Sequence, residues 1–224
     1  MVDPLDQLYR RIDHALLKAE VTPADIIEGA RLCCELSLFA FCVNPAWIAI
    51  AAEQLRHTDT SVISVAGFPL GAGRTDIKVD EALRAISDGA AEIDMVANIG
   101  WLLSGDIARA TEEIQAVRQA IPYSVGLKVI IECNLLNPEQ QTRAVTAVID
   151  GGAQFVKTGT GFAGPATVEQ VKRLAMTANG RIEVKAAGGI GTLQACKDML
   201  AAGATRLGCS SSADIIRQWR SSHH

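Results

Sequence analysis

Two lysines stand in otherwise apolar, strand-like segments of the chain, and each segment leads into glycine. They are Lys157, in the segment 153–161, and Lys185, in the segment 182–189. A lysine that ends a buried strand and opens onto a Gly-rich loop is placed for chemistry. Burial beside another cation disfavours the ammonium form, which lowers the pKa and lets the neutral amine attack a carbonyl to form a Schiff base. The two lysines therefore predict covalent chemistry on a carbonyl compound.

The commoner fate of a lysine at a strand end is structural, with its aliphatic stem buried and its charged head group in water. Two lysines in equivalent positions, on what should be neighbouring strands, favour the catalytic interpretation. The positive charge of one would then lower the pKa of the other. A class I aldolase reaction, which proceeds through a Schiff base, is the leading hypothesis.

A carboxylate occupies a similar strand-end position at Asp94. Alternation along a strand places Ile93 and Met95 on the opposite face. The Asp94 side chain should therefore point the same way as Glu92 and Val96. Its spacing is equally compatible with a loop cap or with an ion pair to a structural lysine.

Glycines and serines gather in two late segments that could bind an anion. Gly188 and Gly189 follow the seventh strand-like segment, and the residues 208–212 follow the eighth and open the last helical segment. Backbone N–H groups freed by glycine, a helix N-terminus and serine hydroxyls together form a phosphate site. Turn glycines and a serine helix cap would explain either segment alone, but their joint position favours phosphate.

The segment 159–164 matches the G-x-G-x-x-G pattern of dinucleotide-binding proteins, with Glu183 as the candidate ribose ligand. The match lies late in the chain, directly after a strand that contains a lysine, and Pro165 follows it. Glu183 also falls within its strand, whereas the ribose carboxylate belongs at a strand end. Dinucleotide binding is therefore the weaker interpretation.

The elements that would position these residues alternate along the chain, apolar strand-like segments with amphipathic helical ones. The candidate strands are 11–15, 37–43, 62–67, 92–97, 126–131, 154–158, 183–186 and 205–208. Helical periodicity marks 76–87, 107–120, 138–149, 167–178 and 193–201. Several helices run into glycines that can take the left-handed conformation of a helix C-terminus, at Gly89, at Gly151 and Gly152, and at Gly203.

This rhythm is typical of parallel βα units, and eight units in 224 residues predict an α/β fold, a (β/α)8 TIM barrel with a short N-terminal helix. We expect a single domain spanning residues 1–224, because no linker or change of composition interrupts the chain. A doubly wound open sheet is the alternative topology. In a barrel, reactive side chains come from the carboxyl ends of the strands, where Lys157, Lys185 and Asp94 all fall.

Composition excludes several classes of partner. Hydrophobic residues make up 49% of the chain, which is enough for a full core. A formal charge of −4 and a pI of about 5.6 provide no basic surface for nucleic acid or an anionic membrane. No apolar run is long enough to span a bilayer and the N-terminus lacks a signal-peptide pattern, so we expect a cytoplasmic protein.

Cysteines and histidines indicate neither a disulfide framework nor a metal. The six cysteines form no C-x-x-C pair and are expected to be reduced core residues. His223 and His224 end the chain in a tail typical of an expression remnant, which leaves only His14 and His57 elsewhere. No zinc site can be assembled from these, so we expect no metal and no other cofactor.

Short motifs follow one another in order along nearly the whole chain: Asp13-His14 with 16–18, then 42–45, 67–72, 92–96 with 98–100, 127–132, 155–158 with 160–162, 184–186 with 188–190, and Gly208 with Ser210 and Ser211. Together they resemble the 2-deoxyribose-5-phosphate aldolase family, and several motifs in order are far more specific than one alone. The resemblance implies a (β/α)8 barrel, no metal, and a homo-oligomer such as a dimer or tetramer. It also implies small-molecule aldehyde and sugar-phosphate substrates.

The resemblance further implies roles for individual residues. Lys157 would form the Schiff base, and Lys185 would depress the pKa of Lys157 and take part in proton transfer. Asp94 would act with Lys185 and a water as general acid and base. Acetaldehyde would be held as an enamine on Lys157 and added to glyceraldehyde 3-phosphate, or released in the cleavage direction. The phosphate would rest on Gly161, Gly188, Gly189, Gly208, Ser210 and Ser211.

The chain departs from the family pattern at several small residues. Gly159 and Ala187 stand where family members commonly carry serine, and Ala15 stands where threonine is frequent. Gly191 replaces an arginine that could face phosphate, and the terminal tyrosine of some members is absent. Two alternatives therefore stay open: a Schiff-base aldolase for an unphosphorylated or different aldehyde, and a non-catalytic sugar-phosphate-binding barrel.

Overall fold

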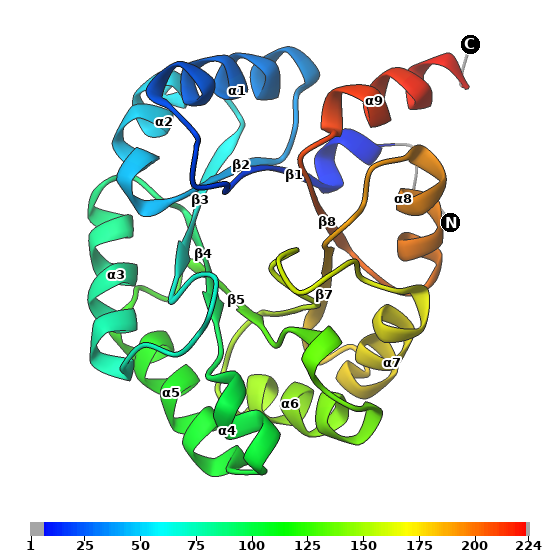
Figure 1. The fold of residues 1–224 in the computed structure, drawn as a ribbon. Helices are drawn as coiled ribbons and strands as arrows, with labels where there is room; N and C mark the ends of the chain where they lie inside the picture. Colours follow the sequence, from blue (N-terminus) through cyan, green and yellow to red (C-terminus); the bar gives the residue numbers. More distant parts are fainter. Residues whose placement is uncertain (1–6, 223–224) are drawn as a thin grey trace.

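The computed structural model describes residues 7–222, whereas residues 1–6, on which the expectation of no signal peptide rests, and the tail His223-His224 lie outside the described part. Eight parallel strands close into a barrel in which each strand pairs with the next and the eighth pairs with the first. The helices form a ring around these strands (Figure 1). The predicted (β/α)8 fold is confirmed. The doubly wound alternative is wrong, because the sheet has no open edge.

The strands lie close to the predicted segments. They are β1 (Ile12–Leu16), β2 (Ala40–Val43), β3 (Ser61–Ala66), β4 (Glu92–Val96), β5 (Gly126–Ile130), β6 (Phe155–Lys157), β7 (Glu183–Ala187) and β8 (Arg206–Cys209). The α-helices within the described residues are α1 (Pro23–Leu36), α2 (Ile48–Leu55), α3 (Thr75–Ser87), α4 (Ile99–Ser104), α5 (Ile107–Ala120), α6 (Pro138–Asp150), α7 (Val168–Ala178), α8 (Leu193–Ala201) and α9 (Ser212–Ser221). Short 3-10 helices are η1 (Leu8–Arg11), η2 (Pro45–Trp47) and η3 (Cys133–Leu135).

Reciprocal side-chain caps start three of the helices. Thr22, Asn137 and Thr167 each accept a hydrogen bond from the backbone N–H three residues on, and the side chain of that third residue accepts from the cap's own N–H in return. Each cap satisfies N–H groups that have no partner within the helix. Proline at the first position of α1 and α6 adds a backbone angle that suits a helix start. These local signals place the helices between the strands.

Glycine in the left-handed region turns the chain from helix to strand, as predicted. Gly89, Gly152 and Gly203 follow α3, α6 and α8 with φ values of 113°, 79° and 108°. Gly151 instead keeps a right-handed conformation with φ of −74°. A residue with a Cβ would be strained at the three left-handed positions, so the helices end where the sequence requires.

The second strand begins later than predicted, because α1 extends to Leu36. Ser37 is the C-cap of α1 and takes the left-handed conformation, with φ of 56°. The N–H of Leu38 then donates to the carbonyl of Cys33, which closes the end of the helix. No glycine marks this end in the sequence, so the predicted strand 37–43 wrongly absorbed the helix terminus. The observed β2 starts at Ala40.

Pairing between neighbouring strands sets the polar side chains of the interior side by side. Lys157 on β6 pairs with Lys185 on β7, and Asp94 on β4 pairs with Lys128 on β5. The prediction that the two lysines lie on neighbouring strands is confirmed. Since side chains alternate between the interior and the helix layer, this register brings charged groups together inside an otherwise apolar cylinder.

A buried ion pair between two of the outer helices holds the loops that follow β3 and β4. Lys78 on α3 lies 2.7 Å from the carboxylate of Glu113 on α5, and both side chains are fully buried. The Lys78 ammonium also donates to the carbonyls of Gly71 and Val96, while the Glu113 carboxylate accepts from the N–H of Asn98. The pair thereby fixes the loops that follow β3 and β4.

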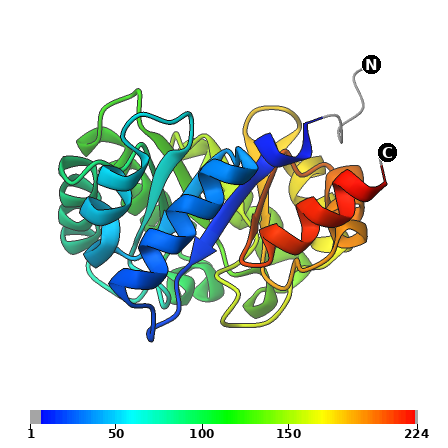
Figure 2. The ribbon, with the colours of Figure 1, turned by 90° about the horizontal axis from the view of Figure 1, so that it is seen from above.

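The two ends of the described chain meet on one side of the barrel. Figure 2 shows η1 beside α9, and the rings of Tyr9 and Trp219 lie 5.9 Å apart between them. Among the helices of residues 7–222, none combines the length and the apolar character that crossing a bilayer requires.

His14 on β1 faces the helix layer and is almost fully buried. Its Nδ1 lies 2.7 Å from the hydroxyl of Ser212 at the start of α9, and its ring stacks on Phe41. Burial lowers the pKa of His14 to about 4 from its usual 6.5. The folded protein therefore holds His14 neutral over a pH range in which the unfolded chain binds a proton.

We predict that stability falls as the pH drops from 6.5 to 4, because only the unfolded state protonates His14 in that window. The contribution of His14 is at most about 3 kcal/mol in the free energy of unfolding. Urea denaturation at several pH values should show a smaller loss for His14→Gln than for the wild type. His57→Gln, at an exposed histidine, is the matched control. Identical pH dependence in the wild type and His14→Gln would contradict this role.

Candidate active site

One carboxylate, that of Asp94, joins three lysines inside the barrel. Its Oδ2 accepts from the Nζ of Lys157 and from the Nζ of Lys185, each at 2.7 Å. Its Oδ1 accepts from the Nζ of Lys128 at 3.0 Å. The Asp94 side chain is fully buried, and so is that of Lys128. The two predicted lysines and the predicted carboxylate therefore meet, and a third lysine joins them.

Further carboxylates and an arginine surround the lysines, so that positive and negative side chains alternate. The Nζ of Lys185 also pairs with Asp13 on β1 at 2.5 Å, and the Nζ of Lys128 pairs with Glu92 at 2.5 Å. Arg206 on β8 lies 3.1 Å from Asp13 and 3.5 Å from Glu92. Each buried cation thus faces carboxylates, which is the condition for burying charge at all.

The network outweighs the effect of burial on the pKa values of Asp94 and Lys185. Burial would raise the pKa of Asp94, but Lys128, Lys157 and Lys185 hold it well below its usual range. Burial would lower the pKa of Lys185, but Asp13 and Asp94 raise it above its usual value of 10.5. Asp94 is therefore a carboxylate and Lys185 an ammonium near neutral pH.

This finding changes the electrostatic picture expected from the sequence. Lys185 was expected to lower the pKa of Lys157 through its positive charge. The structure instead places the Asp94 carboxylate against both amines, through the same oxygen atom. The amines of Lys157 and Lys185 therefore share one hydrogen-bond acceptor.

A pocket of about 480 Å³ opens above these lysines at the carboxyl ends of the strands. Lys157 and Lys185 line it, and the side chain of Lys157 is 4% exposed, compared with 1% for Lys185 and none for Lys128. The side chain of Lys157 is thus the most exposed of the three. The volume suits a small metabolite.

Every residue expected to bind phosphate lines this same pocket, and those residues are Gly161, Gly188, Gly189, Gly208, Ser210 and Ser211. Gly161, Gly188 and Gly189 take left-handed φ values of 90°, 108° and 70°. Ser211 is the N-cap residue of α9, but its side chain makes no capping hydrogen bond. Backbone and hydroxyl groups therefore surround the rim of the pocket.

Two polar residues hold the loop that follows Lys157. The hydroxyl of Thr158 donates to the carbonyl of Ala187 and accepts from its N–H, both at 2.9 Å, which ties the ends of β6 and β7 together. Glu132, in a left-handed conformation with φ of 49°, accepts from the N–H and the hydroxyl of Thr160. A Cβ at Gly159 would come within 2.5 Å of the Glu132 carboxylate, so the glycine makes room for this contact.

Sequence reasoning missed three members of the site. Lys128 breaks an apolar strand in the same way as Lys157 and Lys185, so the same signal could have found it. Asp13 stood in the middle of the predicted strand 11–15, and its motif with His14 carried no assigned role. Glu132 had no signal of its own, because its contact depends on a left-handed backbone conformation.

The dinucleotide interpretation fails on the position of Glu183. This residue is the first of β7 and is exposed, so it lies at the opposite end of the barrel from the pocket. The segment 159–164 serves instead as the loop that lines the pocket after β6. Phe162 in this loop packs edge-on against Phe68 from the loop after β3, with ring centroids 5.5 Å apart.

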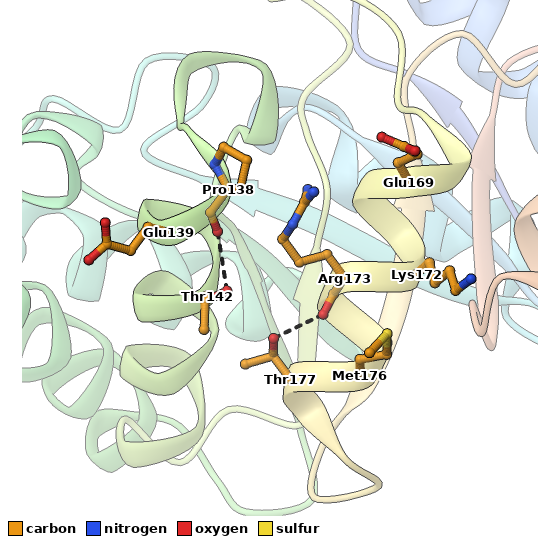
Figure 3. A pocket seen from close by; sticks show the side chains of 8 residues that line it. All are labelled: Pro138, Glu139, Thr142, Glu169, Lys172, Arg173, Met176 and Thr177. Atoms are coloured by element: carbon orange, nitrogen blue, oxygen red, sulfur yellow. Dashed lines mark hydrogen bonds between the residues drawn. The ribbon is translucent and has the colours of Figure 1, made fainter.

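A second hollow lies outside the barrel, between α6 and α7 (Figure 3). Within it the Thr142 and Thr177 hydroxyls donate to carbonyls of their own helices, and Arg173 donates to Gln141. None of the residues that the sequence predicted to be functional lines this hollow. The candidate site is therefore the pocket at the barrel mouth.

The other histidines, cysteines and carboxylates of the described residues are spread over many strands and helices. Within residues 7–222, no three His, Cys, Asp or Glu residues are grouped so as to hold a metal ion. All six cysteines are free. Cys42 lines the pocket, and burial together with Asp94 raises the pKa of its thiol to about 11, so it is uncharged at neutral pH.

Comparisons with known proteins agree with this site. Residues 8–218 match the model of a family described as DeoC/LacD family aldolase. The chain belongs to this family of aldolases. A deoxyribose-phosphate aldolase of Geobacillus sp. (strain WCH70) is 43% identical over 215 residues, which cover 94% of this chain and 95% of the relative.

Solved structures of aldolases share the whole barrel. An aldolase called QR15 superposes with a TM-score of 0.93 at 38% identity, covering 100% of this chain and 98% of its own. A deoxyribose phosphate aldolase from Aeropyrum pernix, described as tetrameric, superposes with a TM-score of 0.90 at 28% identity, covering 99% of this chain and 94% of its own. This chain therefore resembles aldolases in both its sequence and its fold.

We predict that Asp94→Asn destabilises the aldolase by about 3–5 kcal/mol, because it leaves buried ammonium groups without their shared carboxylate. Lys128→Met should cost less in the Asp94→Asn background than in the wild type, since it then removes one uncompensated cation. Urea denaturation of the four proteins gives this coupling energy. Additive effects of the two substitutions would show that Asp94 does not hold the lysines together.

Proposed function

We propose that this aldolase reversibly cleaves 2-deoxy-D-ribose 5-phosphate to acetaldehyde and D-glyceraldehyde 3-phosphate through a Schiff base. The observation that carries the proposal is the contact of one buried carboxylate with two lysines on the floor of a pocket with a glycine and serine rim. The floor suits imine chemistry on a carbonyl, and the rim suits a phosphate group. The name of the Geobacillus relative agrees with this substrate.

Lys157 is the nucleophile in this proposal. It ends β6, it is the most accessible of the three lysines, and the loop that follows it lines the pocket. Lys128 is fully buried and pairs with Glu92 as well as Asp94, so it is not accessible to a substrate. The alternative of purely structural lysines fails to explain why two of the amines open into one cavity.

The amine of Lys157 attacks the C1 aldehyde of the open-chain sugar, and loss of water yields the protonated imine. This imine withdraws electrons as the C2–C3 bond breaks. The C3 hydroxyl gives its proton to a water held by Asp94 and Lys185 and becomes the aldehyde of glyceraldehyde 3-phosphate, and the same water later returns a proton to C2. The remaining two carbons stay on Lys157 as an enamine. Protonation at C2 and hydrolysis of the imine release acetaldehyde and restore the amine.

Asp94 and Lys185 move the protons that these steps require. Asp94 Oδ2 contacts both amines, so together with a water it can relay the proton that Lys157 must lose before it attacks. Lys185, kept charged by Asp13 and Asp94, is the acid that donates to the departing hydroxyl, directly or through a water. In this proposal the Asp94 carboxylate links the two amines by hydrogen bonds. Lys185 therefore acts on Lys157 through this shared carboxylate as well as through its positive charge.

Phosphate would bind at the rim through backbone N–H groups and the hydroxyls of Ser210 and Ser211, near the N-terminus of α9. We also propose that the chain forms a homo-oligomer and works on small molecules alone. The description of the Aeropyrum relative as tetrameric supports the first of these proposals. The absence of a basic charge balance supports the second.

We predict that acetaldehyde and borohydride add one ethyl group to Lys157, because reduction traps the imine. Peptide mapping by mass spectrometry should find the adduct in the wild type and lose it in Lys157→Leu. Lys172→Leu, at an exposed lysine on α7, is the matched control and should keep the adduct. No adduct in the wild type, or an unchanged adduct in Lys157→Leu, would overturn the assignment of Lys157.

A further inference from the structure

Lys18 is the cation at the pocket rim that is available to an anion. In the part of the chain that the structure describes, three cationic side chains line the pocket: Lys18, Lys157 and Lys185. The last two contact the buried carboxylate of Asp94. Lys18 is 79% exposed and pairs only loosely with Glu20, at 3.9 Å, so its ammonium can turn toward a ligand.

Closure of the barrel brings Lys18 next to the glycine and serine rim. Strand β1 pairs with β8, with Asp13 opposite Gly208 and His14 opposite Cys209. The loop that begins after Leu16 therefore runs beside the loop of residues 209–211. Lys18 stands two residues beyond β1 and lines the same pocket as Ser210 and Ser211.

Among the residues of the rim that the structure describes, no other side chain carries a positive charge to match a phosphate dianion. Its glycines and serines provide neutral N–H and O–H donors. Gly191 also lines the pocket, and a Cβ built there would lie 3.9 Å from the Ser211 hydroxyl, in ordinary contact. A side chain at position 191 would thus begin beside the rim, but glycine brings no charge to it.

We propose that Lys18 binds the phosphate of the substrate and determines the preference for a phosphorylated sugar. The inference rests on the proposed function for the presence of that phosphate, and it adds a residue to the rim. Because the ammonium is exposed and flexible, it acts as a point charge that closes on the anion, while the backbone groups set the position of the anion. Lys18 is a substrate-binding residue and takes no part in the chemistry on Lys157.

The test measures binding of inorganic phosphate by calorimetry and turnover of deoxyribose 5-phosphate on the same preparations. We expect Lys18→Met to raise the Kd for phosphate and the KM for the sugar phosphate about tenfold, with little change in kcat. Lys18→Arg should bind almost as well as the wild type. Glu20→Gln should bind phosphate more tightly, since it removes the loose partner of Lys18. Lys172→Met, a distant exposed lysine, should match the wild type.

A second variant keeps the proposal falsifiable if Lys18→Met only disturbs the loop. Gly191→Arg introduces a cation beside Ser211, so Lys18→Met/Gly191→Arg should recover the phosphate affinity that Lys18→Met loses. Unchanged phosphate affinity and KM in Lys18→Met would overturn the role of Lys18. A loss in Lys18→Met that Gly191→Arg does not recover, and that Lys18→Arg shares, would also overturn it, because the effect would then be structural.

The outcomes separate this inference from the proposed function. If the wild type binds phosphate and loses that binding in Lys18→Met but does not cleave deoxyribose 5-phosphate, the role of Lys18 holds and the assigned reaction fails. If the wild type cleaves the sugar phosphate and Lys18→Met cleaves it with the same KM, the reaction holds and the role of Lys18 fails. Failure of the wild type to bind phosphate overturns the inference directly.

Discussion

The rest of the site depends on the contact between the Asp94 carboxylate and three lysine ammonium groups. Three lysines point into a closed barrel from β5, β6 and β7, and like charges so close together would repel strongly in an apolar interior. Asp94 compensates all three through its two oxygens, and Asp13 and Glu92 compensate what remains. Without this carboxylate the register that pairs Lys157 with Lys185 would be unfavourable.

The pocket has two chemically different parts, a charged floor and a polar rim. The charged network forms the floor of the pocket through Lys157 and Lys185 and continues beneath it, whereas the rim consists of glycine, serine and backbone groups. In the proposed function, the reaction takes place on side chains of β4, β6 and β7, and the substrate phosphate binds to the loops after β6, β7, β8 and β1, which the closed barrel brings together. Thr158 links the two regions, since it ties the strand end that carries Lys157 to the loop after β7.

Much of this arrangement was predictable from the sequence, because charged residues that interrupt apolar strands are conspicuous. Lys157, Lys185 and Asp94 all show that signal, and eight strand-like segments implied the closed fold that brings them together. The pairing of Lys185 with Asp13 was not predictable, since it requires that the first strand lie two places from the seventh around a closed barrel. Helix end signals also failed at Ser37, where serine replaces glycine in the left-handed conformation.

Other features depend on which charges lie close together in the folded chain, and the local sequence does not indicate them. The availability of Lys18 follows only from knowing that the other cations of the pocket are already compensated. The role of Glu132 depends on a backbone conformation that non-glycine residues seldom adopt. The direction in which the pKa of Lys185 shifts depends on whether burial or the neighbouring carboxylates dominate, which requires the distances themselves.

The measurement that tests the account most directly is the protonation of Lys185, followed by 15N NMR of the lysine side chains across a pH titration. A Lys185→Met sample assigns the signal, which is the one that it lacks. The account predicts that Lys185 remains an ammonium group up to and above pH 10.5, because Asp13 and Asp94 outweigh burial. Loss of the ammonium signal near neutral pH would contradict the central claim that the shared carboxylate determines the charge of the site.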